Sequence, residues 1–461
     1  MPKLGCDSRP RQTEPPLNGA VPHGLRVTVK MTLMATQVVE KFRPTESSGT
    51  FSVFETTIRH LGGLMAAYEL SGDASLLDRA RDLGDHLMLA FRTPTGIPMG
   101  FCQLKTGSCT TASWMPGVRA SSSWLSLCLC CLSATATRVP FAAQRVFLAD
   151  VGSLQLEMSA LSFSTGNATY SDTAERAVMA LLNSKQQPGG KAEGLLYRMY
   201  NPLDGAVMDD RVGMGAFSDS AYEYLLKLWV AGGRSPAVAP YWRRWEKMAL
   251  AVDAVMVQTS SPGNLTYLAD AFGPDFTPDR LLHELEHFAC FAGGMFVLGA
   301  EGQHAERFLK LGRGIGETCY QMYARTATGL APDRVYFRRG GEDDFTVGDP
   351  RNCLRPETVE SLFYLYRKTG EQKYRDQGWA IFQAFEKHSK AKGGYSGLRD
   401  VRNVPAAHDG IQQSFFLAET LKYLYLLFAD GNTVHLDEWV FNTEAHLMRV
   451  RARQSSLYTY P

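Results

Sequence analysis

Isolated carboxylates interrupt otherwise apolar helical patterns at several points of the chain, and they are the residues best suited to do chemistry. Glu157 lies inside Leu154-Gln-Leu-Glu-Met, and Glu419 lies inside Phe415-Phe-Leu-Ala-Glu-Thr-Leu. An acid inside so apolar a run is costly unless it is paired or functional. Paired carboxylates without a motif for a Ser, Cys or His nucleophile are typical of glycoside hydrolysis.

Glu55 and Arg59 are four residues apart, so they share one face of a predicted helix. The simplest interpretation of such a pair is an exposed ion pair on the helix surface. The pair Gly62-Gly63 follows one turn later and predicts open space beside the two charges, which would suit a ligand. The pattern alone leaves both interpretations open.

Two further acids stand where helices are predicted to begin. Pro356 fits the first turn of a helix, so Glu357 lies near the positive helix end, which favours the ionised form that a general base needs. Asp219 precedes Ser220-Ala-Tyr-Glu-Tyr-Leu-Leu-Lys in the position of an N-cap. Each acid also has a purely structural interpretation: Glu357 as a favourable acid in the first turn of its helix, and Asp219 as a plain N-cap.

The C-terminal stretch Phe441-Asn-Thr-Glu-Ala-His446 follows a predicted helix and ends the globular part. The oxygens of Thr443 and of a nearby acid could bind a hard cation, although a single threonine does not specify a metal site. No GxSxG, P-loop or GxGxxG motif occurs in its proper context. The run from Gly294 to Gly299 is apolar and helical, which predicts helix packing.

Helical periodicity dominates from about residue 51, and similar segments recur in 68–91, 161–182 and 365–385. Each segment reads as a helix, a short (S/T)-G-(D/N/E) turn and a second helix. The glycine suits the left-handed end of the first helix, and the polar residue beside it suits the start of the second. Such αα-hairpins stack as an open solenoid or close into a toroid. The irregular repeat spacing favours the closed toroid.

The composition excludes several functional classes. Among 461 residues, 48 Lys and Arg balance 47 Asp and Glu, which argues against a nucleic-acid binder and an acidic disordered chain. No eighteen apolar residues run together, so we expect no membrane span. Nine cysteines are too few for a disulfide framework in a chain of this length, and they lack the paired spacing of a zinc site.

Taken together, these segments resemble glycoside hydrolase family 47, the class I α-1,2-mannosidases. The resemblance covers residues 51–446 and is carried, in the family's order, by 52–73, 152–158, 219–227, 287–295, 352–370, 412–428 and 439–446. It implies an all-α (α/α)7 barrel over residues 51–450. It also implies one Ca2+ ion and exo-acting, inverting hydrolysis of terminal α-1,2-linked mannose from high-mannose N-glycans.

The resemblance also implies residue roles. Glu55 corresponds to the general acid, Glu357 to the base that activates water, and Asp219 to a third carboxylate that shares the acid role. Thr443 corresponds to the side chain that contacts Ca2+, and Cys290 and Cys319 to a structural disulfide. The residues that correspond to the mannose subsite are Arg59, Glu157, His287, Asp333, Arg355, Phe415, Glu419 and Glu444. Phe415 would form an apolar platform under the sugar.

The sequence departs from the family pattern in four places. Residues 1–50 are expected to be poorly ordered and do not resemble the family's barrel-closing first helix. Residues 112–150 are expected to be an insertion, either a loop or a translated intron. Asp333 replaces the glutamate of the family's Gly-Leu-x-Pro-Glu and is one methylene shorter. Glu286 replaces the aspartate before the pocket histidine. Apart from these four departures, residues 451–461 follow the barrel and are expected to be a tail.

By resemblance, we expect a monomer in the secretory pathway, either in the Golgi or endoplasmic-reticulum lumen or secreted, with glycoproteins bearing high-mannose N-glycans as partners. No signal peptide or anchor is visible, and Asn167 and Asn264 begin glycosylation sequons. The alternatives are an inactive or weakly active mannose-binding protein of glycoprotein quality control, and a misassembled gene product. A sugar epimerase on the same barrel is a third and more remote alternative, which would need catalytic histidines.

Overall fold

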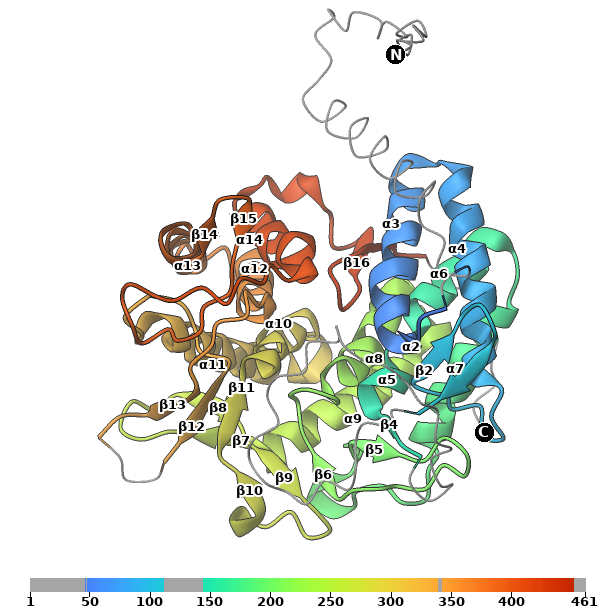
Figure 1. Cartoon of the computed structure of the whole chain (residues 1–461). Coiled ribbons are helices and arrows are strands. Elements are labelled where there is room, and N and C mark those ends of the chain that lie inside the picture. Colours follow the sequence, from blue (N-terminus) through green and yellow to red (C-terminus); the bar gives the residue numbers. More distant parts are fainter. Residues whose placement is uncertain (1–45, 47, 112–143, 339–341, 452–461) are drawn as a thin grey trace, which may run out of the picture.

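The computed structural model describes residues 46, 48–111, 144–338 and 342–451, and Figure 1 shows their arrangement. Most of the expected poorly ordered segment 1–50, most of the expected insertion 112–150 and nearly all of the tail 451–461 lie outside the described residues. Within them, no helix is long and apolar enough to cross a membrane.

Helices make up about half of the described residues. The α-helices are α2 (Val53–Glu55), α3 (Gly62–Ser71), α4 (Ala74–Leu87), α5 (Leu148–Gly152), α6 (Gln155–Thr165), α7 (Thr169–Leu182), α8 (Asp219–Ala231), α9 (Ala239–Val255), α10 (Phe291–Leu298), α11 (Ala305–Ala324), α12 (Glu357–Thr369), α13 (Lys373–His388) and α14 (Leu421–Phe428). Two π-helical stretches, η2 (Thr56–Leu61) and η10 (Phe416–Thr420), precede α3 and α14. The 3₁₀ turns are η3 (Met88–Phe91), η5 (Gly190–Ala192), η6 (Pro236–Val238), η7 (Pro278–Arg280), η8 (His287–Cys290), η9 (Gly302–His304) and η11 (Gly431–Thr433).

The three similar segments form αα-hairpins, as predicted. Gly72 ends α3, Gly166 ends α6 and Gly370 ends α12, with φ angles of 73°, 72° and 71°. This left-handed conformation reverses the chain at little steric cost because glycine has no Cβ. The second helices of the hairpins, α4, α7 and α13, pack back against α3, α6 and α12.

The hairpins assemble into an inner row and an outer row of helices (Figure 1). Along the inner row, successive neighbours pack against each other in the order α3, α6, α8, α10, α12, α14. The outer helices α4, α7, α9, α11 and α13 each pack on the inner helix that precedes them. The inner helices therefore all run in the same direction, and their N-terminal ends meet at one end of the barrel.

Short strands connect the helices. Three three-stranded sheets have the orders β1-β2-β3, β10-β9-β6 and β11-β12-β13, and β4-β5, β7-β8, β14-β15 and β16-β17 form two-stranded ladders. The strands are β1 (Phe51–Ser52), β2 (Phe101–Gln103), β3 (Ser108–Thr110), β4 (Val146–Phe147), β5 (Met199–Tyr200), β6 (Arg211–Val212), β7 (Val257–Thr259), β8 (Thr266–Leu268), β9 (Asp270–Phe272), β10 (Leu281–Leu282), β11 (Glu284–Glu286), β12 (Arg334–Phe337), β13 (Phe345–Asp349), β14 (Lys390–Ala391), β15 (Gly394–Tyr395), β16 (Trp439–Phe441) and β17 (Leu447–Arg449). All of these ladders are antiparallel.

One region differs from the sequence predictions in detail. The end of the expected insertion belongs to the barrel, because Val146 and Phe147 pair with β5 as β4 and residues 148–150 begin α5, which packs on α8. Val146 and Leu148 are buried, so this stretch supplies core contacts. The glycines of α10 do serve close packing, as predicted: a Cβ on Gly294 would lie 3.2 Å from the Ser361 backbone.

Candidate active site

The N-terminal ends of the inner helices bring the predicted catalytic carboxylates to one end of the barrel. Glu357 is the first residue of α12 and Asp219 is the first residue of α8. The prediction of Asp219 as an N-cap is wrong by one position, because Ser218 occupies the cap. The Asp219 carboxylate accepts from the adjacent Ser220 N–H at 2.8 Å instead of capping a turn further on.

Glu55 and Arg59 form the predicted pair on one helix face. Arg59 Nε donates to Glu55 at 2.6 Å, and Arg59 Nη1 also contacts the buried Glu444. The same nitrogen donates to Ser414 Oγ at 3.1 Å, and the guanidinium lies 5.9 Å from the centre of the Phe415 ring. Arg59 therefore joins η2 to the C-terminal hairpin and to the start of η10.

The predicted open space beside Gly62 and Gly63 is absent, because the C-terminal hairpin fills it. A Cβ on Gly62 would lie 2.7 Å from Asn442 Nδ2, and a Cβ on Gly63 would lie 3.3 Å from the His446 ring. The two glycines thus allow close approach of the residue 442–446 turn. The ligand space implied by the glycine pair is occupied by protein.

Glu157 is fully buried and is held by residues of two other elements. Tyr224 Oη donates to its Oε1 at 2.6 Å, and Asn442 Nδ2 donates to the same oxygen at 2.6 Å. Burial raises the pKa of Glu157 to about 7, although these two donors oppose the rise. Its other oxygen, Oε2, is buried without a hydrogen-bond partner among the described residues.

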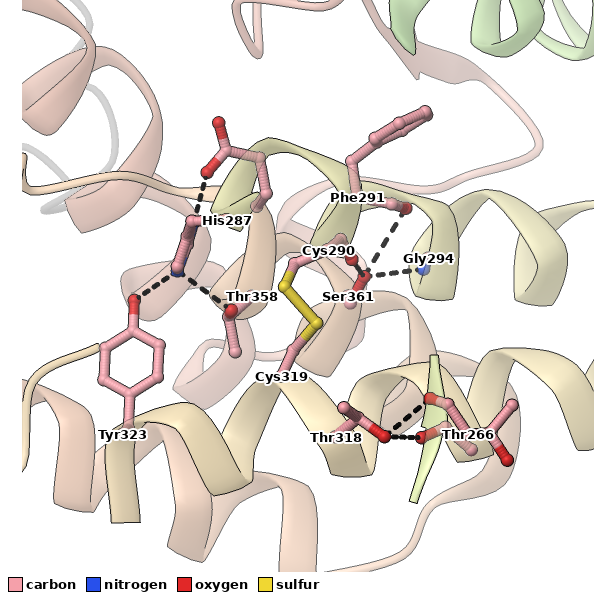
Figure 2. Close-up of a disulfide and its surroundings, with 12 residues drawn as sticks. Thr266, His287, Cys290, Phe291, Gly294, Thr318, Cys319, Tyr323, Thr358 and Ser361 are labelled. Carbon is pink, nitrogen blue, oxygen red and sulfur yellow. Dashed lines mark hydrogen bonds and ion pairs between the residues drawn. A yellow bond between two sulfur atoms is a disulfide. The ribbon is translucent and has the colours of Figure 1, made fainter. Parts of the chain in front are cut away.

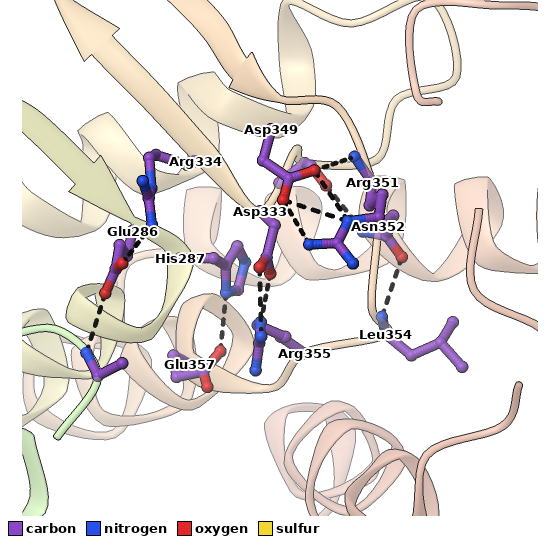
Figure 3. Close-up of polar contacts among 12 residues, drawn as sticks. Glu286, His287, Asp333, Arg334, Asp349, Arg351, Asn352, Leu354, Arg355 and Glu357 are labelled. Carbon is purple, nitrogen blue, oxygen red and sulfur yellow. Dashed lines mark hydrogen bonds and ion pairs between the residues drawn. The ribbon is translucent and has the colours of Figure 1, made fainter. Parts of the chain in front are cut away.

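Glu357 contacts a histidine (Figure 3), and the other side of that ring is held by Tyr323 and Thr358 (Figure 2). His287 Nδ1 lies 2.7 Å from Glu357 Oε2, and its Nε2 lies 2.9 Å from Tyr323 Oη and 3.1 Å from Thr358 Oγ1. The imidazole is 2% exposed, whereas 12% of the Glu357 side chain is exposed. The arrangement orients one carboxylate oxygen and leaves the residue accessible to a small molecule.

Both acidic departures from the family pattern retain charged partners (Figure 3). Asp333 makes a buried ion pair with Arg355, whose guanidinium carbon lies 3.7 Å from the centre of the Phe288 ring. Arg355 holds the pKa of Asp333 below its usual value, against the effect of burial. Glu286 accepts from Arg334 at 2.7 Å and from the Ala216 N–H, just before α8, at 3.0 Å.

Burial favours the protonated form of several acids in the site, and neighbouring negative charges add to this effect for Asp219 and Glu419. Burial raises the pKa of Asp219 to about 7, and the charges of Glu223 and Glu357 add to the rise. Burial also raises the pKa of Glu444 to about 7 despite the Arg59 charge. The pKa of Glu419 lies well above its usual value, through burial and then the Glu444 charge. Such groups can hold a proton at neutral pH.

Thr443 lies between Asn442 and Glu444 in the turn after β16, next to this acidic region. No cluster of three or more His, Cys, Asp or Glu side chains in the described parts of the chain is arranged to chelate a metal. A hard cation at Thr443 would therefore need the threonine oxygens, water and ligand oxygens. The unpartnered Oε2 of Glu157 and the raised pKa values of the nearby acids fit such a cation.

Cys290 and Cys319 form the disulfide that the resemblance implied, joining the start of α10 to α11 (Figure 2). A second disulfide, Cys102–Cys109, closes the β2–β3 hairpin. No sequence prediction anticipated this second bond, although the two cysteines oppose each other in the strand register.

The structure adds residues to the site that sequence reasoning missed. Tyr224, Tyr323 and Asn442 orient predicted site residues, and Asn442 Oδ1 also accepts from the Glu444 N–H at 2.9 Å. Tyr224 and Asn442 lie inside motifs already singled out, so their place in those motifs was the available signal. Tyr323 lies in an ordinary amphipathic helix, and nothing in the sequence marked it as a site residue.

Comparisons with known proteins agree with the fold. The sequence profile of glycosyl hydrolase family 47 matches residues 28–450, and the chain belongs to this family. A solved alpha-1,2-mannosidase from Trichoderma reesei superimposes with a TM-score of 0.77 at 29% identity, covering 92% of this chain and 89% of that one. The expected fold class, an (α/α)7 barrel, is thereby confirmed.

Two curated relatives show the same relationship in sequence. A mannosyl-oligosaccharide 1,2-alpha-mannosidase of Arabidopsis thaliana is 43% identical over 405 residues, which is 87% of this chain and 65% of the relative. A mannosyl-oligosaccharide alpha-1,2-mannosidase IA of Drosophila melanogaster is 38% identical over 418 residues, 90% of this chain and 57% of the relative. The chain thus spans less than two thirds of the length of these relatives.

Proposed function

We propose that this chain is a calcium-dependent, exo-acting glycosidase that releases terminal α-1,2-linked mannose from high-mannose N-glycans with inversion. The observation that carries the proposal is the pair of carboxylates at the ends of α8 and α12. Glu357 is oriented by His287, and burial raises the pKa of Asp219 to about 7. This reaction requires two carboxyl groups, one that holds a proton and one that accepts a proton.

In this mechanism Glu357 is the general base. It accepts a proton from a water molecule as the water oxygen attacks the anomeric carbon of the terminal mannose. His287 Nδ1 lies 2.7 Å from Glu357 Oε2, so the other carboxylate oxygen, Oε1, is the one proposed to face the water. Glu357 is the first residue of α12 and 12% of its side chain is exposed, so a water molecule can reach it.

An acid on the opposite side of the bond gives a proton to the glycosidic oxygen as the C–O bond breaks. Asp219 is suited to this role because burial raises its pKa to about 7, so it can hold a proton near neutral pH. Glu55 is the other candidate acid, and it pairs with Arg59 at 2.6 Å. Arg59, Arg355, Glu419 and Glu444 offer donors and acceptors to the mannose hydroxyls, and Phe415 offers an apolar surface to the ring.

The residues near Thr443 fit a calcium ion, and we assign Ca2+ to that place. Thr443 would hold the ion through its hydroxyl and carbonyl oxygens, with Glu157 and Glu444 as the acids that offset its charge. The ion would stabilise sugar hydroxyls in a distorted ring when bound. The main support is the number of buried carboxyl groups in the region, together with the unpartnered Oε2 of Glu157.

The disulfides and sequons support a place in the secretory pathway. Disulfides persist in oxidising compartments, and the described residues contain two. Asn167 and Asn264 are both exposed, so they are accessible to glycosylation. N-glycans of other proteins are processed in the same compartments, which makes glycoproteins the expected partners.

The test is mannose release from a high-mannose N-glycan by the purified chain, in calcium and in chelator. Glu357→Gln should reduce kcat by about 10² to 10⁴-fold with an unchanged Tm, because only the proton acceptor is lost. Glu386 lies on the outer helix α13 and pairs with Lys390 of β14. Glu386→Gln is the matched control and should leave kcat unchanged.

Two outcomes would count against the proposal. Turnover by Glu357→Gln close to that of the unaltered chain would remove the base assignment. A folded chain that binds the glycan without releasing mannose would favour the mannose-binding alternative.

A further inference from the structure

Lys227 is a buried cation that the proposed mechanism does not use. Its side chain is 2% exposed, and it lies on α8, which begins with Asp219. Asp219, Glu223 and Lys227 follow at intervals of four residues, so they share one face of the helix. Lys227 therefore lies two turns below the carboxylate at the helix end.

The Lys227 ammonium contacts three separate elements. It donates to Glu223 on its own helix, and it lies 3.7 Å from Glu360 Oε1 on α12. It also lies 3.5 Å from the Asn442 carbonyl oxygen, in the turn after β16. Glu360 in turn accepts from the Tyr423 hydroxyl of α14 at 3.2 Å.

These elements are the ones that present the candidate catalytic groups. Glu223 lies one turn below Asp219 on α8, and Glu360 lies one turn below Glu357 on α12. Lys227 thus bridges the two helices one level beneath their first residues. Inverting hydrolysis needs its two carboxyl groups far enough apart to admit a water molecule, and small misplacements reduce the rate strongly.

We propose that Lys227 is a positioning residue: through Glu223 and Glu360 it holds α8 and α12 at the separation that Asp219 and Glu357 need, and its charge offsets the surrounding acids. The inference rests on the proposed glycosidase function. It assigns to one buried lysine a role in the rate and pH dependence of the reaction.

Lys227→Met tests the role of the charge, since a methionine of similar length fits beside the apolar side chains of Phe291, Met295 and Leu298 on α10. We expect kcat to fall about 10- to 100-fold, with KM changed by less than about twofold. The acid limb of the pH–rate profile should move to higher pH by about half a unit, because loss of a nearby cation disfavours the ionised form of a carboxyl group.

The charged and titratable groups that face Glu357 from the surrounding elements are the same in Lys227→Met and in the unaltered chain. Those groups are Asp219, His287, Tyr323, Arg355, Glu360 and Glu419. None of them is altered in Lys227→Met, so a shift reports the loss of the Lys227 charge.

Two variants separate positioning from stability. Lys368→Met removes a lysine near the far end of α12, where it donates to the Ala300 carbonyl at 3.2 Å, and should leave kcat and the pH profile unchanged. Lys227→Met alone leaves Glu223 and Glu360 without their cation and should lower the Tm. The triple variant Lys227→Met/Glu223→Gln/Glu360→Gln removes the buried charges together, so it should restore the Tm but not kcat. A triple variant with full kcat, or a Lys227→Met variant with an unshifted profile and at least half the kcat, overturns the proposal.

The unaltered chain distinguishes the two hypotheses. If it releases no mannose, the proposed function fails irrespective of Lys227. If it releases mannose and Lys227→Met does so equally well, only the positioning role fails.

Discussion

His287 Nδ1 lies 2.7 Å from Glu357 Oε2, and Nε2 of the same ring lies 2.9 Å from the Tyr323 hydroxyl. A ring that donates from Nδ1 to the carboxylate can accept from the tyrosine at Nε2, so both nitrogens are satisfied in one neutral form. The histidine comes from η8, the acid from α12 and the tyrosine from α11. Three elements therefore determine the orientation of one candidate base.

His287→Ala should lower kcat by about 10- to 100-fold, because a hydrogen bond to a charged group contributes about 1.5–3 kcal/mol. The measurement is kcat for mannose release at saturating substrate. Tyr323→Phe removes only the partner at Nε2 and should have a smaller effect. Equal kcat values for His287→Ala and the unaltered chain would show that Glu357 does not depend on this contact.

The metal-free protein should be less stable at pH 8 than at pH 6.5. Burial raises the pKa values of Glu157, Asp219 and Glu444 to about 7, above the value near 4 expected in the unfolded chain. Their protons stabilise the folded state fully below pH 4, and this contribution is lost as the pH rises through 7. We expect a loss on the order of 2 kcal/mol, seen as a Tm lower by a few degrees.

His446 acts in the opposite direction at lower pH, which is why the comparison starts at pH 6.5. Burial lowers the pKa of His446 to about 3. The unfolded chain therefore binds this proton more readily, and the folded state loses stability only as the pH falls below about 6.5. Glu157→Gln is the control, since it removes one of the three titrating acids and should flatten the change in Tm. A Tm that does not fall from pH 6.5 to pH 8 would contradict the prediction.

Calcium should raise the Tm, and Thr443→Val should weaken this effect. A ligand at 100 times its Kd stabilises the folded state by about 2.7 kcal/mol, provided that it does not bind the unfolded chain. Valine keeps the shape of threonine but lacks the hydroxyl oxygen. The measurement is the Tm in calcium and in chelator, and equal values for the unaltered chain would exclude a calcium site of useful affinity.

Loss of the Cys290–Cys319 disulfide should destabilise the protein by about 3–4 kcal/mol, because the bond closes a loop with a sequence separation of 29. Cys290→Ala/Cys319→Ala removes both thiols, and its unfolding in urea gives the free energy. Cys102→Ala/Cys109→Ala opens a loop with a separation of only 7 and should cost less. A larger loss for the shorter loop would contradict this ranking.

Several features could be predicted from the sequence because they depend on neighbouring residues. The left-handed glycines that end α3, α6 and α12 follow from a short turn pattern. The Glu55–Arg59 pair follows from helical spacing, and the place of Glu357 follows from the proline before it. In each case the interacting groups lie within one helical turn along the chain.

The rest was decided by tertiary structure. Glu157 meets Tyr224 and Asn442, which lie 67 and 285 positions away, and these contacts and the surrounding core place its pKa near 7. The hairpin that fills the space beside Gly62, and Lys227 between α8 and α12, likewise depend on distant segments. The chain by itself determined which helices form and which acids stand at their ends. Only packing decided which of those acids are buried, what they contact and which hold a proton, because burial and charge act through space.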